Sequence, residues 1–215
     1  MTTEALPPRR PFKFLGGWLC LDFTNTCNWD DPSLEIERFR HYADVLDWHS
    51  AAGSLAGAEV AALRQQAGQQ PEAAATVLAQ CLRLRETIHR IFGAVAAGQP
   101  PAAPDVAALN EALAAALAHL QIENDGTEFS WGWANPAIDL TQAWWPVVRS
   151  AGELLTSERL ARVGQCGGAS CGWLFFDTTR NHSRRWCEMK HCGNLVKARR
   201  HYRRRKTAES SGPGG

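Results

Sequence analysis

Four cysteines near the C-terminus have the spacing of a metal site. Cys166 and Cys171 form one pair, Cys187 and Cys192 form a second, and the chain between the pairs is long enough for a hairpin. Zinc binds four thiolates in a tetrahedron at about 2.3 Å, and two short-range pairs supply that geometry at little cost in chain entropy. Since four thiolates leave no open position for water, the pattern predicts one structural zinc per chain.

Two disulfides or four free thiols are the alternative to zinc. The N-terminus lacks the apolar run of a signal peptide, and no stretch approaches the roughly 20 apolar residues that cross a bilayer, so we expect a cytoplasmic protein without membrane contact. A reducing compartment favours metal over disulfides. His182 and His191 are candidates to replace a cysteine ligand but are more simply surface residues. Ordinary buried thiols are predicted at Cys20, Cys27 and Cys81.

A strongly basic segment surrounds the second cysteine pair. Residues 180–206 contain eleven Lys and Arg against one acid, a net charge of +10, whereas the remaining 12 basic and 21 acidic residues give −9. This polarity points to an anionic partner at one end. The alternatives are that the cations balance the zinc thiolates, dock on the acidic N-terminal part, or form a solvated face. The predicted nucleic-acid contacts are Arg180, Arg184, Arg185, Lys197, Arg199, Arg200, Arg203 and Arg204.

The elements around the cysteines follow from residue type and spacing. Residues 173–177, WLFFD, predict a strand, TTRNHS predicts a turn, and Arg185 and Trp186 lead back to the third ligand, an order typical of a treble-clef or zinc-ribbon finger. At this return, Arg184 or Arg185 could reach a guanine edge. The run GNLVKARRHYRRRK has helical spacing, with one stripe that we expect to pack, formed by Leu195, Ala198 and Tyr202.

The N-terminal part is predicted to be a helical array with one small hairpin. Residues 14–30 fit either a strand or a short buried helix followed by a loop, because periodicity does not decide. The turn signal at 124–126 predicts a hairpin of about 119–123 with 127–133. Helices are expected from Ser33 to Gly53, over 57–68, from Pro71 to Ala97, from a cap at Asp105 through Leu120, and from Trp144 into Arg162 with a stop at Gly164.

Three polar residues of this part are candidates for a ligand pocket. Asp22, Asn25 and Thr26 could orient a small-molecule effector, while the aromatic residues around them supply contact area. The alternative is that the polar residues order a turn or cap a helix and that the aromatics are core. No phosphate-cradling glycine loop, HExxH motif or nucleophile elbow supports an enzyme, so we expect none. The framing aromatics are Trp18, Phe23 and Trp29.

The stretch CGGASCGWLFFDTTRNHSRRWCEMKHCGNLVKARRHYRRR resembles the CGNR zinc finger. LCLDFTNT, residues 19–26, resembles the N-terminal motif of the companion ABATE domain. The resemblance implies a bacterial, stress-induced transcription regulator that binds DNA through the finger and has a mostly helical N-terminal domain. The signature reads CGNL here, because Leu195 stands where the motif has its final arginine, and the zinc ligands are unaffected.

We therefore predict a mainly α (α+β) protein with an α-rich domain at 1–160, a treble-clef-like finger at 161–206 and a disordered tail at 207–215. The predicted function is regulation of transcription through DNA binding. The alternative is an RNA- or ribosome-associated zinc-ribbon protein, since phosphate contacts do not distinguish the two nucleic acids. One finger with a short basic helix has a small footprint, which favours a homodimer formed through the N-terminal domain.

Overall fold

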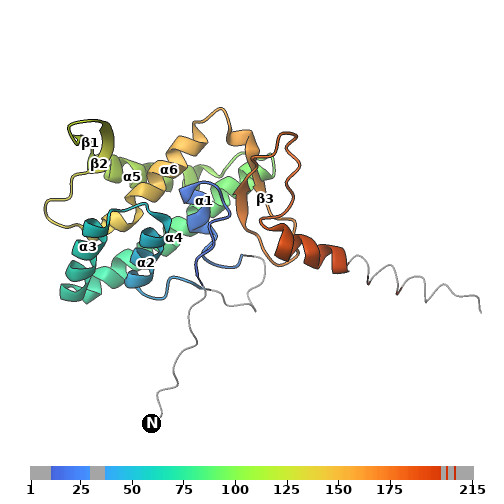
Figure 1. The fold of residues 1–215 in the computed structure, drawn as a ribbon, viewed down its shortest axis with the longest axis horizontal. Helices are drawn as coiled ribbons and strands as arrows, with labels where there is room; N and C mark the ends of the chain where they lie inside the picture. The colour runs from blue at the N-terminus through green and yellow to red at the C-terminus, as the bar shows by residue number, and fades with distance from the viewer. Residues whose placement is uncertain (1–10, 30–36, 200–201, 203–205, 207–215) are drawn as a thin grey trace, which may run out of the picture.

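The computed structural model describes residues 11–29, 37–199, 202 and 206. A body of helices makes up most of the chain, and a small sheet with the four cysteines follows it (Figure 1). This architecture confirms the predicted fold class. Among the described residues, no helix combines the length and the apolar content needed to cross a bilayer. The helices of the body are α1 (Leu19–Thr24), α2 (Tyr42–Ala52), α3 (Gly57–Gln69), α4 (Pro71–Ala96), α5 (Ala103–Leu117) and α6 (Trp145–Leu155).

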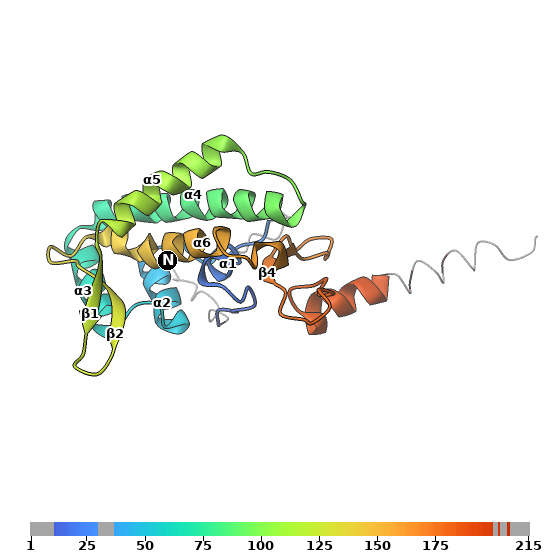
Figure 2. The same cartoon turned by 90° about the horizontal axis from the view of Figure 1, so that it is seen from above.

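Helix α4 is the central element of the body. It begins with Pro71, whose fixed φ suits the first helical turn, and it contacts α1, α2, α3 and α5. Figure 2 shows it running the length of the body beside α5. The helices predicted over 57–68 and 71–97 are confirmed as α3 and α4. The buried apolar face of α4 consists of Val77, Cys81, Leu84, Ile88, Ile91 and Phe92.

Residues 14–30 contain a short buried helix followed by a loop, the second of the two predicted alternatives. Cys20, Leu21 and Phe23 of α1 have no exposed surface. The chain before α1 folds back closely over it, because a Cβ atom added to Gly16 would lie 2.8 Å from the backbone nitrogen of Asp22. Only glycine fits at this crossing.

The helix predicted from Ser33 to Gly53 is wrong in its first part. Residues 33–36 lie outside the described residues, residues 37–41 are not helical, and α2 begins at Tyr42. Asp44 explains this start, because its carboxylate accepts hydrogen bonds from the backbone N–H groups of Arg40 and His41 at 2.8 and 2.9 Å. Gly53 ends the helix as predicted, in the left-handed region at φ 65°.

The predicted boundaries of α5 also need correction. The N-cap is Ala102, whereas Asp105 lies in the first turn and its carboxylate pairs with Arg90 at 2.7 Å. The helix ends at Leu117, a turn follows at residues 118–119, and the predicted end at Leu120 is the first residue of a strand.

The last helix of the body is shorter than predicted. A 3-10 turn, η1 (Leu140–Trp144), precedes α6, and α6 ends at Leu155 instead of continuing to Arg162. The hydroxyls of Thr156 and Ser157 donate to the carbonyls of Gly152 and Leu154, which also accept from the backbone N–H groups of the same two residues. These local side-chain bonds favour an end of the helix at this point. A second 3-10 turn follows, η2 (Leu160–Arg162), and Gly164 lies in a strand instead of ending a helix.

The predicted β-hairpin is confirmed. Strand β1 (Leu120–Asn124) pairs antiparallel with β2 (Phe129–Trp133), and Ile122 lies opposite Trp131. The base of the hairpin packs on α6, where the rings of Trp133 and His119 lie 5.7 and 4.1 Å from that of Trp145.

The strand predicted at 173–177 is present as β4 (Leu174–Phe176), but its partner differs from the expectation. β4 pairs antiparallel with β3 (Val163–Gln165), which precedes the first cysteine, and residues 178–186 return without forming a strand. Val163, Leu174 and Phe176 belong to the hydrophobic core of the helical body, whereas Phe175 packs with the cysteines. The β3–β4 sheet is therefore shared by the helical body and the metal site.

Candidate zinc centre and nucleic-acid interface

The four predicted ligands come together in space. The Sγ atoms of Cys166, Cys171, Cys187 and Cys192 all lie within 4.8 Å of one another. Cys187 Sγ is 3.6 Å from both Cys171 Sγ and Cys192 Sγ. Four sulfurs at about 2.3 Å from a tetrahedral zinc would be roughly 3.8 Å apart, whereas a disulfide bond needs about 2.05 Å. The sulfur positions fit one structural zinc, and a disulfide would require them to move.

The first pair of ligands is positioned by backbone contacts at the end of the β3–β4 sheet. The N–H of Cys166 donates to the carbonyl of Trp173 at 2.8 Å, and the N–H of Cys171 donates to that of Gly168 at 3.2 Å. A Cβ atom on Gly168 would lie 3.3 Å from the Cβ of Cys171 and 3.4 Å from the Sγ of Cys192. The absence of a side chain here lets the chain pass directly over the sulfurs.

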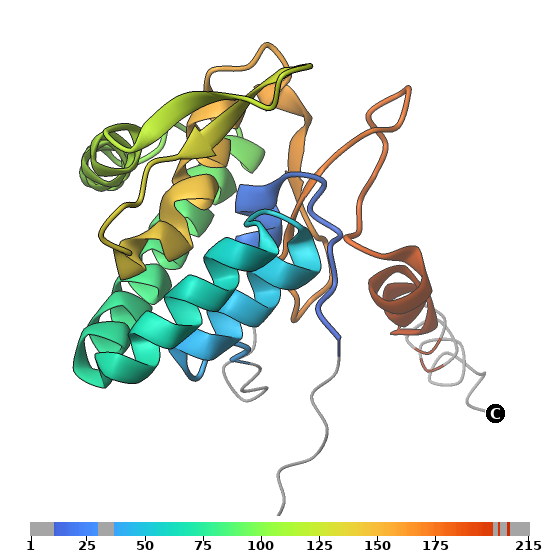
Figure 3. The same cartoon turned by 60° about the vertical axis from the view of Figure 1, so that its left-hand side comes forward.

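The second pair leads into the basic helix. Cys192 lies on a π-helical turn, η3 (Met189–Gly193), and residues 194–199 continue as an α-helix. The N–H of Gly193 donates to the carbonyl of Glu188 at 3.2 Å, which closes the turn. Figure 3 shows the helix that follows standing apart from the helical body. Zinc binding by Cys192 thus fixes the point from which the basic helix projects.

Other cysteines and histidines lie outside this cluster. His182 and His191 are exposed, and neither belongs to the group of potential ligands found among the described residues. Burial raises the pKa of Cys20, Cys27 and Cys81 to about 12, so these thiols stay protonated. Their prediction as ordinary buried thiols is confirmed.

Arg184 has a role that contradicts the predicted base contact. Its guanidinium donates hydrogen bonds of 2.7 to 3.1 Å to four backbone carbonyls and lies over the ring of Phe175 at 4.4 Å. A guanidinium with these partners is not available for a guanine edge. Arg184 instead ties the finger together and to the preceding domain. The four acceptors are the carbonyls of Leu15, Phe176, Trp186 and Cys187.

Asp177, which was predicted only as the last residue of a strand, holds the turn that leads from β4 to Arg184. Its carboxylate is buried and accepts hydrogen bonds from the backbone N–H of Thr179, the Thr179 hydroxyl and the backbone N–H of Arg184. Burial alone would raise the pKa of Asp177, but these hydrogen bonds lower it. An aspartate two residues before a threonine is a signal for such a turn.

The other predicted nucleic-acid contacts divide into two groups. Arg180, Arg185, Lys197 and Arg199 are exposed. A hollow of about 260 Å³ borders the loop after β4, and two arginines that no sequence pattern singled out line it. It is lined by Arg159, Arg162, Phe176 and Thr178. The predicted contacts Arg200, Arg203 and Arg204 lie outside the described residues.

The stripe expected to pack on the basic helix does not pack. Leu195 is 43% exposed, Tyr202 is 68% exposed, and Ala198 is exposed as well. The reason is tertiary: the helix projects away from the body, so its apolar stripe has no described element opposite it (Figure 3).

The finger is fastened to the helical body by polar contacts. The side chain of Asn25 pairs with the backbone of Leu174, donating to its carbonyl at 2.8 Å and accepting from its N–H at 2.9 Å. Trp173 Nε1 donates to the carbonyl of Cys27, and His89 Nε2 lies 2.9 Å from the carbonyl of Gly172. Because a carbonyl only accepts, His89 Nε2 carries the proton.

The predicted ligand pocket is corrected by these contacts. Asp22 accepts a 2.7 Å hydrogen bond from the backbone of Gly16, and Thr26 donates to a carbonyl of α1 and accepts from Arg85. Asp22, Asn25 and Thr26 are buried, with exposed fractions of 7%, 3% and 4%. Their polar groups are used within the protein, as in the alternative reading. The framing aromatics are structural too, because Trp18 packs on Phe176, Phe23 is core and Trp29 stacks on His89.

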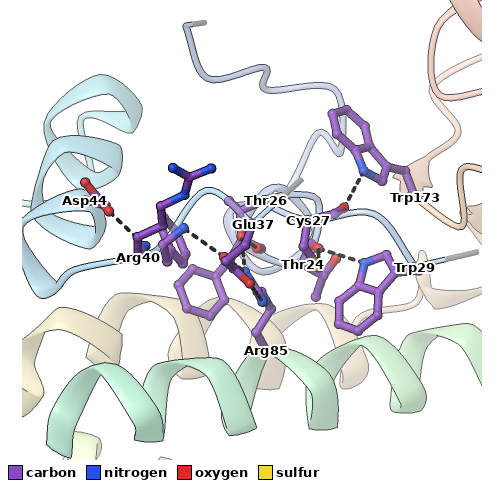
Figure 4. A network of polar contacts seen from close by, with 11 residues as sticks. Thr24, Thr26, Cys27, Trp29, Glu37, Arg40, Asp44, Arg85 and Trp173 are labelled. Carbon is purple, nitrogen blue, oxygen red and sulfur yellow. Dashed lines mark hydrogen bonds and ion pairs between the residues drawn. The ribbon is translucent and has the colours of Figure 1, made fainter. Parts of the chain in front are cut away.

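An ion pair between a buried arginine and a partly exposed glutamate lies beside the same loop, and no sequence pattern predicted it. Arg85 of α4 is only 4% exposed and forms two hydrogen bonds with Glu37, at 2.8 and 2.5 Å. Figure 4 shows Arg85 facing both Glu37 and Thr26, with Trp29 on the same loop and Trp173 of the finger reaching Cys27 from the other side. This network joins the loop after α1 to the central helix.

Two family models match the chain. The first, ABATE, is described as "Putative stress-induced transcription regulator" and matches residues 17–158, more than half of the chain. The second, the CGNR zinc finger, matches residues 162–205. No curated protein matches the sequence.

Proposed function

We propose, from the premise that the chain belongs to the ABATE family and ends in a CGNR zinc finger, that it regulates transcription by binding duplex DNA through the finger. In this proposal Arg180, Arg185, Lys197 and Arg199 contact phosphates or base edges. The protein acts by binding, without catalysing a reaction, and zinc serves to hold the finger in shape.

The observation that carries the proposal is the separation of charge in space. The segment from 180 to 206 has a net charge of +10, and its described helical part projects from a remainder of net charge −9 (Figure 1). The three rival uses of these cations fit this arrangement less well. Counter-charges for zinc would point at the sulfurs, and cations docked on the acidic body would be covered by it, whereas Lys197 and Arg199 are exposed. A merely solvated face does not require eleven basic residues.

RNA is the second candidate partner. The projecting helix favours duplex DNA, because the B-DNA major groove is about 12 Å wide and admits an α-helix, whereas the A-form major groove is deep and narrow. A small-molecule input through Asp22, Asn25 and Thr26 is not part of the proposal, since their polar groups are already bonded within the protein.

The test is a fluorescence titration of the full-length protein at several salt concentrations. Duplex DNA and structured RNA compete in parallel samples. Each neutralised phosphate contributes about −0.9 to the slope of log affinity against log salt on duplex DNA. The triple variant Arg185→Ala, Lys197→Ala and Arg199→Ala should therefore flatten this slope by roughly 2 to 3 units.

The matched control removes three exposed arginines of the helical body. Arg40→Ala, Arg64→Ala and Arg83→Ala change the net charge equally but lie outside the finger, so the slope should stay within about one unit of the wild-type value. A finger variant that folds normally and keeps the wild-type slope would overturn the proposal. Tighter binding of RNA than of duplex DNA at every salt concentration would replace DNA by RNA as the partner.

A further inference from the structure

The outer half of the β1–β2 hairpin exposes a cluster of large apolar side chains. Ile122, Phe129 and Trp131 are 66%, 75% and 57% exposed. Side chains alternate between the two faces of a strand, and Ile122 lies directly opposite Trp131, so these three share one face. We call them the hairpin patch. Scattered apolar residues on a surface are normal, but three large ones on one small element mark an interaction surface.

Contacts within the chain hold the hairpin at its base and at its tip. At its base, Trp133 packs on Trp145. At its tip, the carboxylate of Asp125 accepts hydrogen bonds from the N–H and hydroxyl of Thr127 and from the N–H of Glu128. An apolar surface presented on a pre-organised element loses little conformational entropy when a partner binds.

We propose that the hairpin patch is the interface of a two-fold symmetric dimer of this protein. In such a dimer the same surface serves both copies, and the patch of one copy covers the patch of the other. Both strands of the two-stranded sheet are edge strands, so the backbone leaves room for a second hairpin beside or against it.

The area of the patch suits a second copy. Large apolar and aromatic side chains bury about 150 to 250 Å² each. Three of them, each about two-thirds exposed, would bury roughly 300 to 500 Å² on each copy, and roughly twice that in a pair. Stable interfaces bury about 1,200 Å² or more in total. The hairpin patch thus supplies most of the apolar centre of the dimer interface, and polar residues around it supply the rest of the buried area.

The charges around the patch are self-complementary. Asp125 and Glu128 lie at the tip, and Arg149 of α6 lies near the base, with its guanidinium 5.1 Å from the ring of Trp131. Arg149 also pairs with Glu153 of its own helix at 2.8 Å, so the acidic tip of a second copy would share this guanidinium with Glu153. In an antiparallel pair of hairpins, the acidic tip of one copy faces the Arg149 of the other, twice by symmetry. This arrangement selects one relative orientation of the two copies.

The position of the hairpin leaves both fingers accessible. Figures 1 and 2 show the hairpin at the opposite end of the molecule from the helix that follows the cysteines. A dimer through the hairpin patch would carry two fingers at its far ends. A role for the two fingers in DNA binding rests on the proposed function, but the dimer does not. The dimer and DNA binding can therefore be disproved separately.

The experiment is sedimentation equilibrium of the full-length protein over a wide concentration range, without nucleic acid. We expect a monomer–dimer equilibrium for the wild type. The double variant Ile122→Thr and Phe129→Thr keeps residues that suit a strand and should weaken dimerisation at least tenfold. The control, Val106→Thr with Leu117→Thr, removes two exposed apolar side chains of α5 and should leave the dimerisation constant within about twofold, as expected of surface substitutions.

Circular dichroism and the salt slope on DNA show that the hairpin variant is folded and still binds. A wild-type protein that stays monomeric at every concentration would overturn the dimer and leave the hairpin patch to another protein. An equally strong dimer in the hairpin variant would place the interface elsewhere and also overturn the proposal. Neither outcome touches DNA binding, which the finger variants test independently.

Discussion

At the scale of single residues, the finger depends on two arginines that are neighbours in sequence but differ in role. Arg184 donates to four backbone carbonyls and stacks on Phe175, whereas Arg185 is exposed and contributes its backbone carbonyl, which accepts from the N–H of Gly167 at 2.9 Å. Arginine has five donors in a planar fork, and lysine has three on a single nitrogen. A conservative exchange should therefore separate the two roles.

Arg184→Lys should lower the free energy of unfolding by about 2 to 4 kcal/mol, because buried carbonyls lose their donors. Arg185→Lys should change it by less than about 0.5 kcal/mol. Denaturant titrations of the two variants measure their unfolding free energies. Binding of each variant to specific and scrambled duplexes measures its sequence preference. If Arg184→Lys were fully stable but lost sequence preference, the guanidinium would be reading a base after all.

Asp22 is the residue whose charge state should be visible in the stability of the protein. Burial raises the pKa of its carboxyl from 3.8 to about 6, although hydrogen bonds from the backbone near Gly16 oppose the shift. An acid with a raised folded pKa stabilises the fold at low pH and loses that contribution as the pH rises through about 6. Asp22→Asn resembles the protonated acid and keeps an acceptor for Gly16.

The difference in unfolding free energy, Asp22→Asn minus wild type, should therefore grow with pH. Between pH 5 and 7.5 we expect an increase of about 1 kcal/mol in favour of the variant. This window avoids the acidic range in which protons displace zinc from thiolates. Urea titrations at several pH values test it, and a difference that is constant over the window would show that the carboxyl is charged throughout.

At the scale of elements, the β3–β4 sheet has two faces with different partners. Leu174 and Phe176 point into the core of the helical body, and Phe175 between them points to the cysteines. The N–H of Phe176 also donates to the carbonyl of Gly16 at 2.7 Å. The sheet therefore has a source of stability that does not depend on the metal, whereas the apolar packing described for residues 186–193 is a small cluster around the sulfurs.

Removal of zinc should unfold the finger in part. With a chelator, or in Cys187→Ser, amide hydrogen exchange over 186–193 should approach the rate of an unstructured chain, because the metal supplies most of the stability of so small a core. Residues 174–176 should keep measurable protection, and α4 should exchange within about twofold of the holoprotein. Hydrogen-exchange mass spectrometry resolves these segments.

Metal analysis should give one zinc per wild-type chain and a loss of zinc in Cys187→Ser. Equal loss of protection in the sheet and in residues 186–193 would contradict the shared core. Retained protection over 186–193 without metal would instead mean that protein contacts suffice to fold the finger.

At the scale of the whole molecule, the fold places the basic helix away from the acidic body. Zinc places the start of the basic helix, Asn25 and Arg184 seat the finger on the helical body, and the helix then projects into solvent (Figure 3). Under the proposed function, the seating of the finger therefore determines which surface meets nucleic acid.

The sequence alone determined the features that depend on local spacing. The four zinc ligands follow from two short-range cysteine pairs, α3 and α4 from a helical period of apolar residues, and the β1–β2 hairpin from an Asn-Asp-Gly turn between strand-like runs. In each case the residues that decide the structure lie within a few positions of one another, so their chemistry is visible in the sequence.

Only the tertiary structure decided the features that depend on distant partners. In sequence Arg184 resembles its neighbours, but in the fold it donates to the carbonyl of Leu15, and Asp22 resembles a ligand contact but accepts from Gly16. Leu195 is expected to pack, but no described part of the chain covers it. Asn25 and Leu174 are far apart in the chain, yet their contact fixes the finger on the body. Residue type sets what a side chain can bond to, but the fold determines which partner lies within reach.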